Sequence, residues 1–272
     1  MNETMELAKE NVQKELGINT RVVQVDKNGR ICWGLSLTNS QFSPIVYYEN
    51  EGIEEYTRKA EKIFGADYPS PDLRCLADKD FILNNVRMCL QRKTTNDILK
   101  RDLLNLEMYV RLDVSSIMGE NATDRSTVKM TKGLLTLSGL TETEIWDAAK
   151  ENTLAMLDIT NLDEVFGLPV DDGLFDILTC TDRMYGAVAL AFPDTALKSY
   201  CHAKDLKRVY ILPSSIHELL LIDPAKAFDL QAMANMVAEV NAAEVIEEEQ
   251  LDPIVYAYDV ISNTVSIAAT AR

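Results

Sequence analysis

The densest group of potentially reactive side chains lies between Pro213 and Glu218, where the sequence reads PSSIHE. A serine nucleophile requires a histidine base within hydrogen-bonding reach, an acid that orients the histidine, and an oxyanion hole. The residue types for such a site are supplied by Ser214, Ser215, His217 and Glu218. On a strand, however, same-face neighbours stand roughly 6 to 7 Å apart, which is too far for His217 to activate Ser215. The sequence also contains no G-x-S-x-G elbow.

The same segment fits a tight turn between two strands. There the serine hydroxyls would satisfy backbone groups of the turn, and His217 would bond to a neighbouring carbonyl. Pro213 fixes its own φ and biases Leu212 towards extended geometry, which suits the end of a strand. We favour this structural interpretation, and we keep a ligand pocket and catalysis as the alternatives.

A second candidate site is acidic. Asp171, Asp172 and Asp176 lie close together in the sequence and could bind a cation. Their spacing does not match an EF-hand loop, which needs acids at alternate positions and a closing glutamate. We therefore expect a solvated acidic loop without a metal ion. Neither a Walker A motif nor G-x-G-x-x-G occurs, so no nucleotide cofactor is expected.

Cysteine and histidine usage excludes other metal sites. The five cysteines stand at positions 32, 75, 89, 180 and 201, and no pair has the C-x-x-C spacing of a structural zinc site. The only histidines are His202 and His217, which excludes a histidine-rich site. The first residues show neither a basic region nor an apolar core typical of a secretory signal. We expect a cytoplasmic protein with reduced thiols.

The formal net charge of −16 is concentrated in two segments. Residues 139–182 contain eleven acidic residues and one lysine, and residues 223–272 contain nine acidic residues and two basic ones. Contact with a phosphate backbone requires clustered lysine and arginine. Only one modest basic cluster exists, formed by Arg87, Arg92, Lys93, Lys100 and Arg101. We therefore expect no direct binding to nucleic acid, and we expect a protein partner instead.

Hydrophobic periodicity predicts the elements that carry these residues. It predicts helices over 3–16, 52–64, 77–84, 141–152, after 194 and over 229–245. It predicts strands over 21–26, 31–38, 44–48, 87–92, 107–113, 127–130, 175–180, 187–192, 209–212, 217–222, 254–258 and 264–268. Asn28-Gly29 predicts a hairpin, and Thr141 with Glu144 predicts a capping box.

This order of elements predicts an α+β fold with mainly antiparallel sheets and amphipathic helices packed on one side. The run YPSPD at 68–72 indicates a break between an N-terminal hairpin-plus-helix region, 1–68, and a main region, 69–272. One continuous domain is the alternative. No apolar run approaches the length of a membrane-spanning helix, so no membrane association is expected.

One string in the sequence resembles a known family. LPSSIHE at 212–218 is its centre, accompanied by Gly186-Ala187, Tyr210-Ile211, Val240-Asn241 and, less specifically, PIVYY at 44–48. Together they resemble an uncharacterised bacterial domain family of unknown function, found in gut-type anaerobes and their mobile elements. The resemblance covers most of the chain and is most specific over 175–259. It implies a cytosolic protein, and it assigns no catalytic residue.

These observations leave three functional hypotheses. The first is a non-enzymatic cytosolic protein-interaction module, because no complete catalytic motif is present. The second is an acidic inhibitor or nucleic-acid mimic that acts for a mobile element against a host system. The third is an enzyme or ligand binder that uses the turn from Ser214 to Glu218. The sequence does not indicate the oligomeric state.

Overall fold

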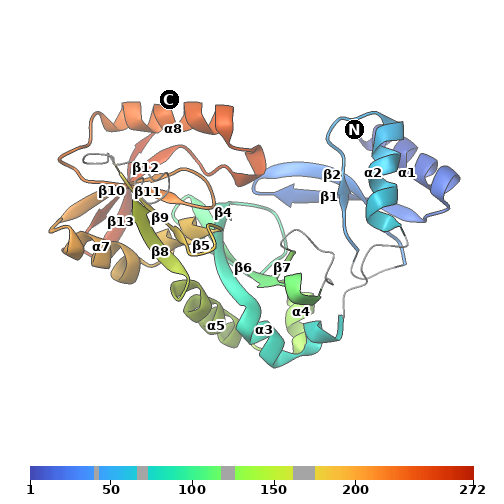
Figure 1. Cartoon of the computed structure of the whole chain (residues 1–272), viewed down its shortest axis with the longest axis horizontal. Coiled ribbons are helices and arrows are strands. Elements are labelled where there is room, and N and C mark those ends of the chain that lie inside the picture. Colours follow the sequence, from blue (N-terminus) through green and yellow to red (C-terminus); the bar gives the residue numbers. More distant parts are fainter. Residues whose placement is uncertain (40–42, 66–72, 118–125, 162–174) are drawn as a thin grey trace. The chain divides into compact units, whose positions relative to one another are not determined.

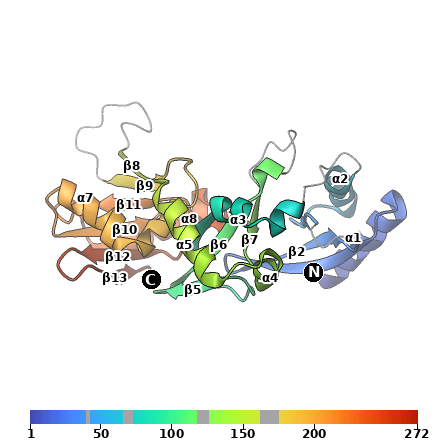
Figure 2. The same cartoon turned by 90° about the horizontal axis from the view of Figure 1, so that it is seen from below.

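A computed structural model shows the arrangement of the elements (Figures 1 and 2). It describes residues 1–39, 43–65, 73–117, 126–161 and 175–272. The chain divides into two compact units. Unit 1 comprises residues 1–72, 94–96 and 115–124, and unit 2 comprises residues 73–93, 97–114 and 125–272. The predicted boundary between residues 68 and 69 lies outside the described residues.

Unit 1 is a three-stranded antiparallel sheet packed against two helices. Its elements are α1 (Asn2–Leu16), β1 (Thr20–Lys27), β2 (Arg30–Leu37), β3 (Val46–Tyr47) and α2 (Ile53–Phe64). Asn28 and Gly29 join β1 to β2 with φ angles of 52° and 84°, as a type I′ hairpin turn requires. The unit's apolar core is formed by Met5, Ala8, Val12, Leu35, Val46, Tyr56 and Ala60. The predicted hairpin and both predicted helices are confirmed.

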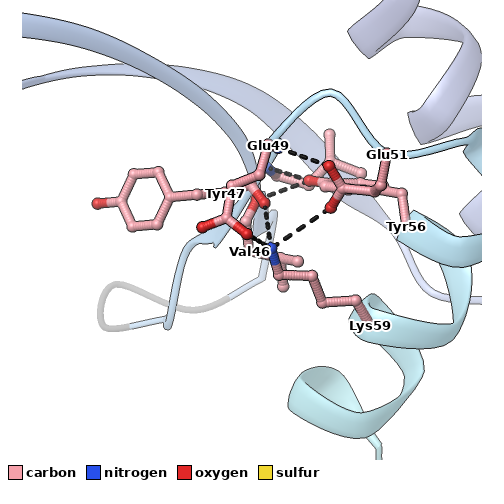
Figure 3. Close-up of polar contacts among 7 residues, drawn as sticks. Val46, Tyr47, Glu49, Glu51, Tyr56 and Lys59 are labelled. Atoms are coloured by element: carbon pink, nitrogen blue, oxygen red, sulfur yellow. Dashed lines mark hydrogen bonds and ion pairs between the residues drawn. The ribbon is translucent and has the colours of Figure 1, made fainter. Parts of the chain in front are cut away.

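The Tyr56 hydroxyl links α2 to two strands of the unit 1 sheet (Figure 3). It donates to the carbonyl oxygen of Val46 at 2.6 Å and accepts from the backbone amide of Leu35 at 3.1 Å. The Tyr56 side chain is fully buried, so no water replaces these bonds. The single hydroxyl therefore satisfies two main-chain groups in the core of the unit.

Lys59 lies one turn further along α2 and binds the chain around β3 (Figure 3). Its Nζ lies 2.9 Å from the carbonyl oxygen of Tyr47 and 2.8 Å from the carboxylate of Glu49. The carboxylate of Glu51 lies 3.4 Å away. The Lys59 side chain is about one-third exposed, so these contacts lie at the edge of the core. Tyr56, Lys59 and their partners form what we call the Tyr56 cluster.

Unit 2 contains a four-stranded antiparallel sheet in which β6 pairs with three neighbours. Its strands are β4 (Val86–Arg92), β5 (Lys100–Leu103), β6 (Leu106–Asp113) and β7 (Thr127–Lys129). The 3₁₀ turn Leu73–Ala77 and the helices α3 (Lys79–Asn85), α4 (Lys132–Ser138) and α5 (Glu142–Leu154) belong to the same unit. Helix α5 packs against β4, and α3 packs against α5 and β6. Thr141 and Glu144 form the predicted capping box at the start of α5.

A six-stranded antiparallel sheet completes unit 2, in the order β13-β12-β10-β11-β9-β8. The strands are β8 (Leu157–Asn161), β9 (Asp176–Cys180), β10 (Arg208–Pro213), β11 (Leu219–Ile222), β12 (Ile254–Asp259) and β13 (Thr264–Thr270). Helix α8 (Leu230–Glu244) covers one face, as expected (Figure 1). With three antiparallel sheets and these helices, the fold is the predicted α+β class.

The prediction for residues 187–192 is wrong. Residues Gly186–Ala191 form a buried 3₁₀ helix, and Pro193–Leu197 continue as a π turn into α7 (Lys198–Ala203). A short run of apolar residues has no polar face, so its periodicity does not separate a strand from a buried helix. The expected hairpin of 175–180 with 187–192 does not form, because β9 pairs with β8 and β11 instead.

Candidate functional site

The candidate residues 213–218 form the connection between β10 and β11. Pro213 pairs with Leu219 at the base of this connection. The hydroxyl of Ser215, which is 8% exposed, accepts a hydrogen bond from the backbone amide of His217 at 3.0 Å. Ile216 donates its amide to the carbonyl oxygen of Glu249 at 2.8 Å. The segment is a turn held by one hydrogen bond within it and one to the distant residue Glu249, and it contains the serine–backbone bond that the structural interpretation expects.

Both ring nitrogens of His217 face other partners. Its Nδ1 accepts a hydrogen bond from the backbone amide of Tyr185 at 3.1 Å. This acceptance assigns the ring proton to Nε2, which lies 3.3 Å from a carboxylate oxygen of Glu249. Within the described residues, neither the Ser214 hydroxyl nor the Glu218 carboxylate forms a hydrogen bond or an ion pair. The structure therefore does not join Ser214, Ser215, His217 and Glu218 into a nucleophile, base and orienting acid.

The turn is attached to β9 and to the start of the buried 3₁₀ helix, which the segment 183–185 precedes. The carbonyl oxygen of His217 accepts from the amide of Gly186 at 2.8 Å and from the hydroxyl of Thr179 at 2.9 Å. A Cβ on Gly186 would lie 2.2 Å from the Cα of Thr179, so only glycine allows this approach. Arg183 and Tyr185 both have positive φ, 60° and 61°, which is uncommon for residues other than glycine. The surrounding contacts hold this segment in a conformation that its residues disfavour.

Tyr185 connects the turn to a buried group on the four-stranded sheet. Its ring lies 5.2 Å from the His217 ring, centroid to centroid, and the guanidinium carbon of Arg111 lies 4.2 Å from the Tyr185 centroid. Arg111 Nε donates to the sulfur of Cys89 at 3.1 Å. Arg111 is 2% exposed and Cys89 is fully buried. We call Cys89, Tyr109, Arg111 and Tyr185 the Arg111 cluster.

Sequence reasoning missed Cys89, Arg111 and Tyr185 as site residues. One signal was present, because Arg111 interrupts the otherwise apolar run YVRL at 109–112. A charged residue inside such a strand indicates either an edge or a buried charge. The location of Tyr185 over Arg111 depends on the backbone angles of 183–185, which periodicity does not reveal.

The acidic candidates do not form a metal centre in the described part of the chain. Asp176, at the start of β9, accepts from the Tyr200 hydroxyl at 2.8 Å and pairs with Lys204 Nζ at 3.0 Å. Asp171 and Asp172 lie outside the described residues. Among the residues that are described, no group of three or more histidine, cysteine, aspartate or glutamate side chains is arranged to hold a metal ion. The five cysteines, all described, form no disulfide bond.

Comparison with known proteins identifies the family. The chain matches the family of unknown function DUF5688 over residues 1–260 and belongs to that family. This confirms the expected membership of an uncharacterised domain family. No curated protein and no solved structure matches the chain. In the described residues, no helix has both the length and the apolar character needed to cross a membrane.

Proposed function

For this member of the DUF5688 family, we propose a non-enzymatic, cytoplasmic protein-interaction module that receives an extended basic segment of a partner protein. The segment adds as a further strand to β13. The observation that carries the proposal is the character of β13, which stands at the end of the strand order and is exposed along most of its length. The strand lies beyond residue 260, where the family match ends.

The sequence of β13 lacks the features that normally protect an edge strand. Natural edges are blunted by charged side chains, proline or bulges, because an open edge offers its backbone groups to another chain. Residues 264–270 read TVSIAAT and contain neither a charge nor a proline. At the other end of the same sheet, β8 carries Asp158. A bulge between Val255 and Tyr256 affects the pairing of β12 with β13, but β13 still extends over seven residues.

The charge near this edge favours a basic partner over a second copy of the chain. The segment 223–272 carries nine acidic residues and two basic ones. Helix α8, which packs across β12 and β13, exposes Glu239 and Glu244 to solvent. Two copies with a net charge of −16 repel each other, whereas a lysine- or arginine-rich segment is attracted. Main-chain hydrogen bonds supply the affinity in such strand addition.

The engaged His217 ring supports an interaction role over catalysis. With Nδ1 bonded to the Tyr185 amide and Nε2 beside Glu249, His217 has no ring nitrogen directed at a serine. Ser215 is likewise engaged as the acceptor of the His217 amide. These contacts stabilise the turn between β10 and β11. His217 and Ser215 therefore have a structural role in the sheet to which β13 belongs.

Substitution of one isoleucine tests the proposal. Ile267 is 48% exposed in the middle of β13, and Ile261 is 87% exposed in the β12–β13 turn. Ile267→Lys places a charge on the open edge and blocks strand addition, and Ile261→Lys adds the same charge outside the strand. Both full-length variants are expected to unfold near the wild-type temperature. Partner capture from host lysate, quantified by mass spectrometry, should fall about tenfold for Ile267→Lys alone.

Other outcomes would count against the proposal. Equal capture by both variants, or no captured protein at all, contradicts strand addition at β13. If the captured protein binds nucleic acid and is displaced by added duplex, the acidic inhibitor or mimic becomes the better description. Duplex alone is not expected to bind the chain at about 150 mM salt, because few counterions would be released.

A further inference from the structure

Arg111 carries a buried charge for which the described residues supply no carboxylate. Its side chain is 2% exposed, and its Nη1 has no hydrogen-bond partner among the residues that the structure describes. Its contacts are the Cys89 sulfur, 3.1 Å from Nε, and the Tyr185 ring, 4.2 Å from the guanidinium carbon. Buried charges in proteins are normally paired, and an unsatisfied buried group requires an explanation such as a bound ion.

The three other members of the Arg111 cluster, which could become negative by losing a proton, do not neutralise its charge. Burial raises the pKa of the Cys89 thiol above its ordinary value, although the Arg111 charge opposes this shift. Burial also raises the pKa of the Tyr109 and Tyr185 hydroxyls. All three groups are therefore protonated and neutral near pH 7, and the charge of Arg111 is uncompensated within its own cluster.

Cross-strand pairing adds two further cations beside Arg111. Arg111 on β6 stands opposite Arg87 on β4 and opposite Lys129 on β7, so the three side chains share one face of the sheet. Like charges placed directly opposite destabilise a sheet. Asp182 pairs with Arg87 at 2.7 Å, and the amide oxygen of Gln91 lies 2.9 Å from Lys129 Nζ. In the described part of the chain, the central member of the row, Arg111, has neither a carboxylate nor an amide oxygen as a partner.

We propose that the Nη1 of Arg111 is the donor of an anion-binding site that takes an oxyanion, a carboxylate or a phosphate group, beside Tyr185. The segment that carries Tyr185 has positive φ at two non-glycine residues and is attached to the 213–218 turn through His217. This fixes the ring against the guanidinium. An oxyanion accepts a charge-assisted hydrogen bond from Arg111, which is stronger than a neutral one. The site does not depend on β13 or on the proposed partner.

Titration of the full-length protein tests this site. Acetate and phosphate are added at constant ionic strength, with chloride as the balancing salt, and binding is followed by thermal unfolding and calorimetry. Both oxyanions are tested because the geometry does not separate a planar from a tetrahedral group. Saturable stabilisation by at least one of them, with no such effect of chloride, is the expected result.

Two arginine variants locate the effect. Arg111→Met should weaken oxyanion binding by about tenfold or more, the loss expected for one hydrogen bond to a charged group. Arg101→Met is the matched control, because Arg101 is exposed and its guanidinium carbon also lies over an aromatic ring, 4.3 Å from the Trp146 centroid. The control removes the same charge and the same kind of stacking, and it should bind the oxyanion as the wild type does.

A third variant keeps the test valid if Arg111→Met does not fold. Arg111→Lys retains the charge but not the fork of donors, so it should fold and bind more weakly than the wild type. In NMR spectra, the Nε–Hε resonance of Arg111 is identified as the arginine signal that disappears in Arg111→Lys. In the wild type this resonance should shift as the oxyanion is added. No saturable effect of either oxyanion, or an effect unchanged by both Arg111 variants, would overturn the proposal.

Discussion

Tyr56 in unit 1 and Arg111 in unit 2 are both buried polar side chains at the centres of their clusters, but only Tyr56 has its hydrogen bonds complete. The Tyr56 hydroxyl joins a backbone amide and a carbonyl. Arg111 leaves Nη1 without a partner among the described residues. A satisfied buried group stabilises a fold, and an unsatisfied one costs stability. The Tyr56 cluster therefore stabilises unit 1, whereas for the Arg111 cluster we propose a bound ligand.

The largest effect is expected from Tyr56→Phe. The substitution removes both hydrogen bonds of the buried hydroxyl, to the amide of Leu35 and the carbonyl of Val46, so it should lower the free energy of unfolding by about 1–3 kcal/mol. Tyr48→Phe is the control, because the Tyr48 ring contacts the Tyr56 ring but its hydroxyl forms no hydrogen bond within the described residues. Hydrogen exchange of peptides from β2 and β3 in urea measures the change. Equal losses in both variants would show that the Tyr56 hydroxyl is not a structural link.

Arg111→Met should act in the opposite direction. Arg111 is a buried charge with no carboxylate partner among the described residues, and replacing it by an apolar side chain of similar length should raise the free energy of unfolding by about 1–2 kcal/mol in chloride buffer. Arg101→Met, at the exposed cation–π contact with Trp146, should instead lower it by about 0.5 kcal/mol. Urea denaturation of both variants measures the two changes. A loss of about 3 kcal/mol or more for Arg111→Met would mean that its charge is already compensated.

Ser215→Ala extends the comparison to the turn. The Ser215 hydroxyl accepts the His217 amide, so its removal should cost about 0.5–1.5 kcal/mol, the net value of one hydrogen bond. Ser214→Ala, in the same turn, should have almost no effect. Thermal unfolding and partner capture are compared side by side, with His217→Gln included. Wild-type melting with abolished function in any of these variants would make the turn a functional site.

The smallest effect is expected at the exposed edge of the Tyr56 cluster. The hydrogen bond from Lys59 lowers the pKa of Glu49 below its ordinary value of 4.5. A depressed pKa in the folded state stabilises the protein above the unfolded pKa, and this stabilisation disappears as the pH falls through the folded pKa. Because Glu49 is largely exposed, Lys59→Met should cost only a few tenths of a kcal/mol, about the value of a surface ion pair.

A carboxyl titration by NMR checks this last prediction. In Lys59→Met the pKa of Glu49 should rise towards its ordinary value, because the main cause of its depression is gone. Lys62→Met removes the same charge from the last turn of α2 without touching Glu49, and it should leave that pKa where it is. An unchanged Glu49 pKa in both variants would show that Lys59 does not hold the carboxylate.

Elements with signals inside a few residues were predicted well. The Asn28-Gly29 turn requires positive φ at both positions, and the sequence places there the two residues that accept it. Thr141 and Glu144 complete the capping box three residues apart. The prediction missed β5, whose residues KRDL are mostly charged and become a strand only by pairing with β6. It also missed β8, which pairs with β9 from across a long connection.

In the candidate site too, local features were predicted from the sequence and contacts with distant segments were not. The sequence alone determined that residues 213–218 connect two strands, because proline and serine signals are local. It also determined the α+β class, the acidic charge and the absence of a paired-cysteine zinc motif, because these depend on composition and spacing. It did not determine the partners of His217, which come from Tyr185 and Glu249, 32 residues distant in each direction.

Only the tertiary structure decided which polar side chains are buried without a partner. Arg111 is one charged residue among many in the sequence, and its character follows from the strands on either side of it. β4 and β7 place Arg87 and Lys129 opposite it, and the 183–185 backbone places an aromatic ring over it. Burial and pairing are properties of contacts between distant segments, so no local pattern specifies them.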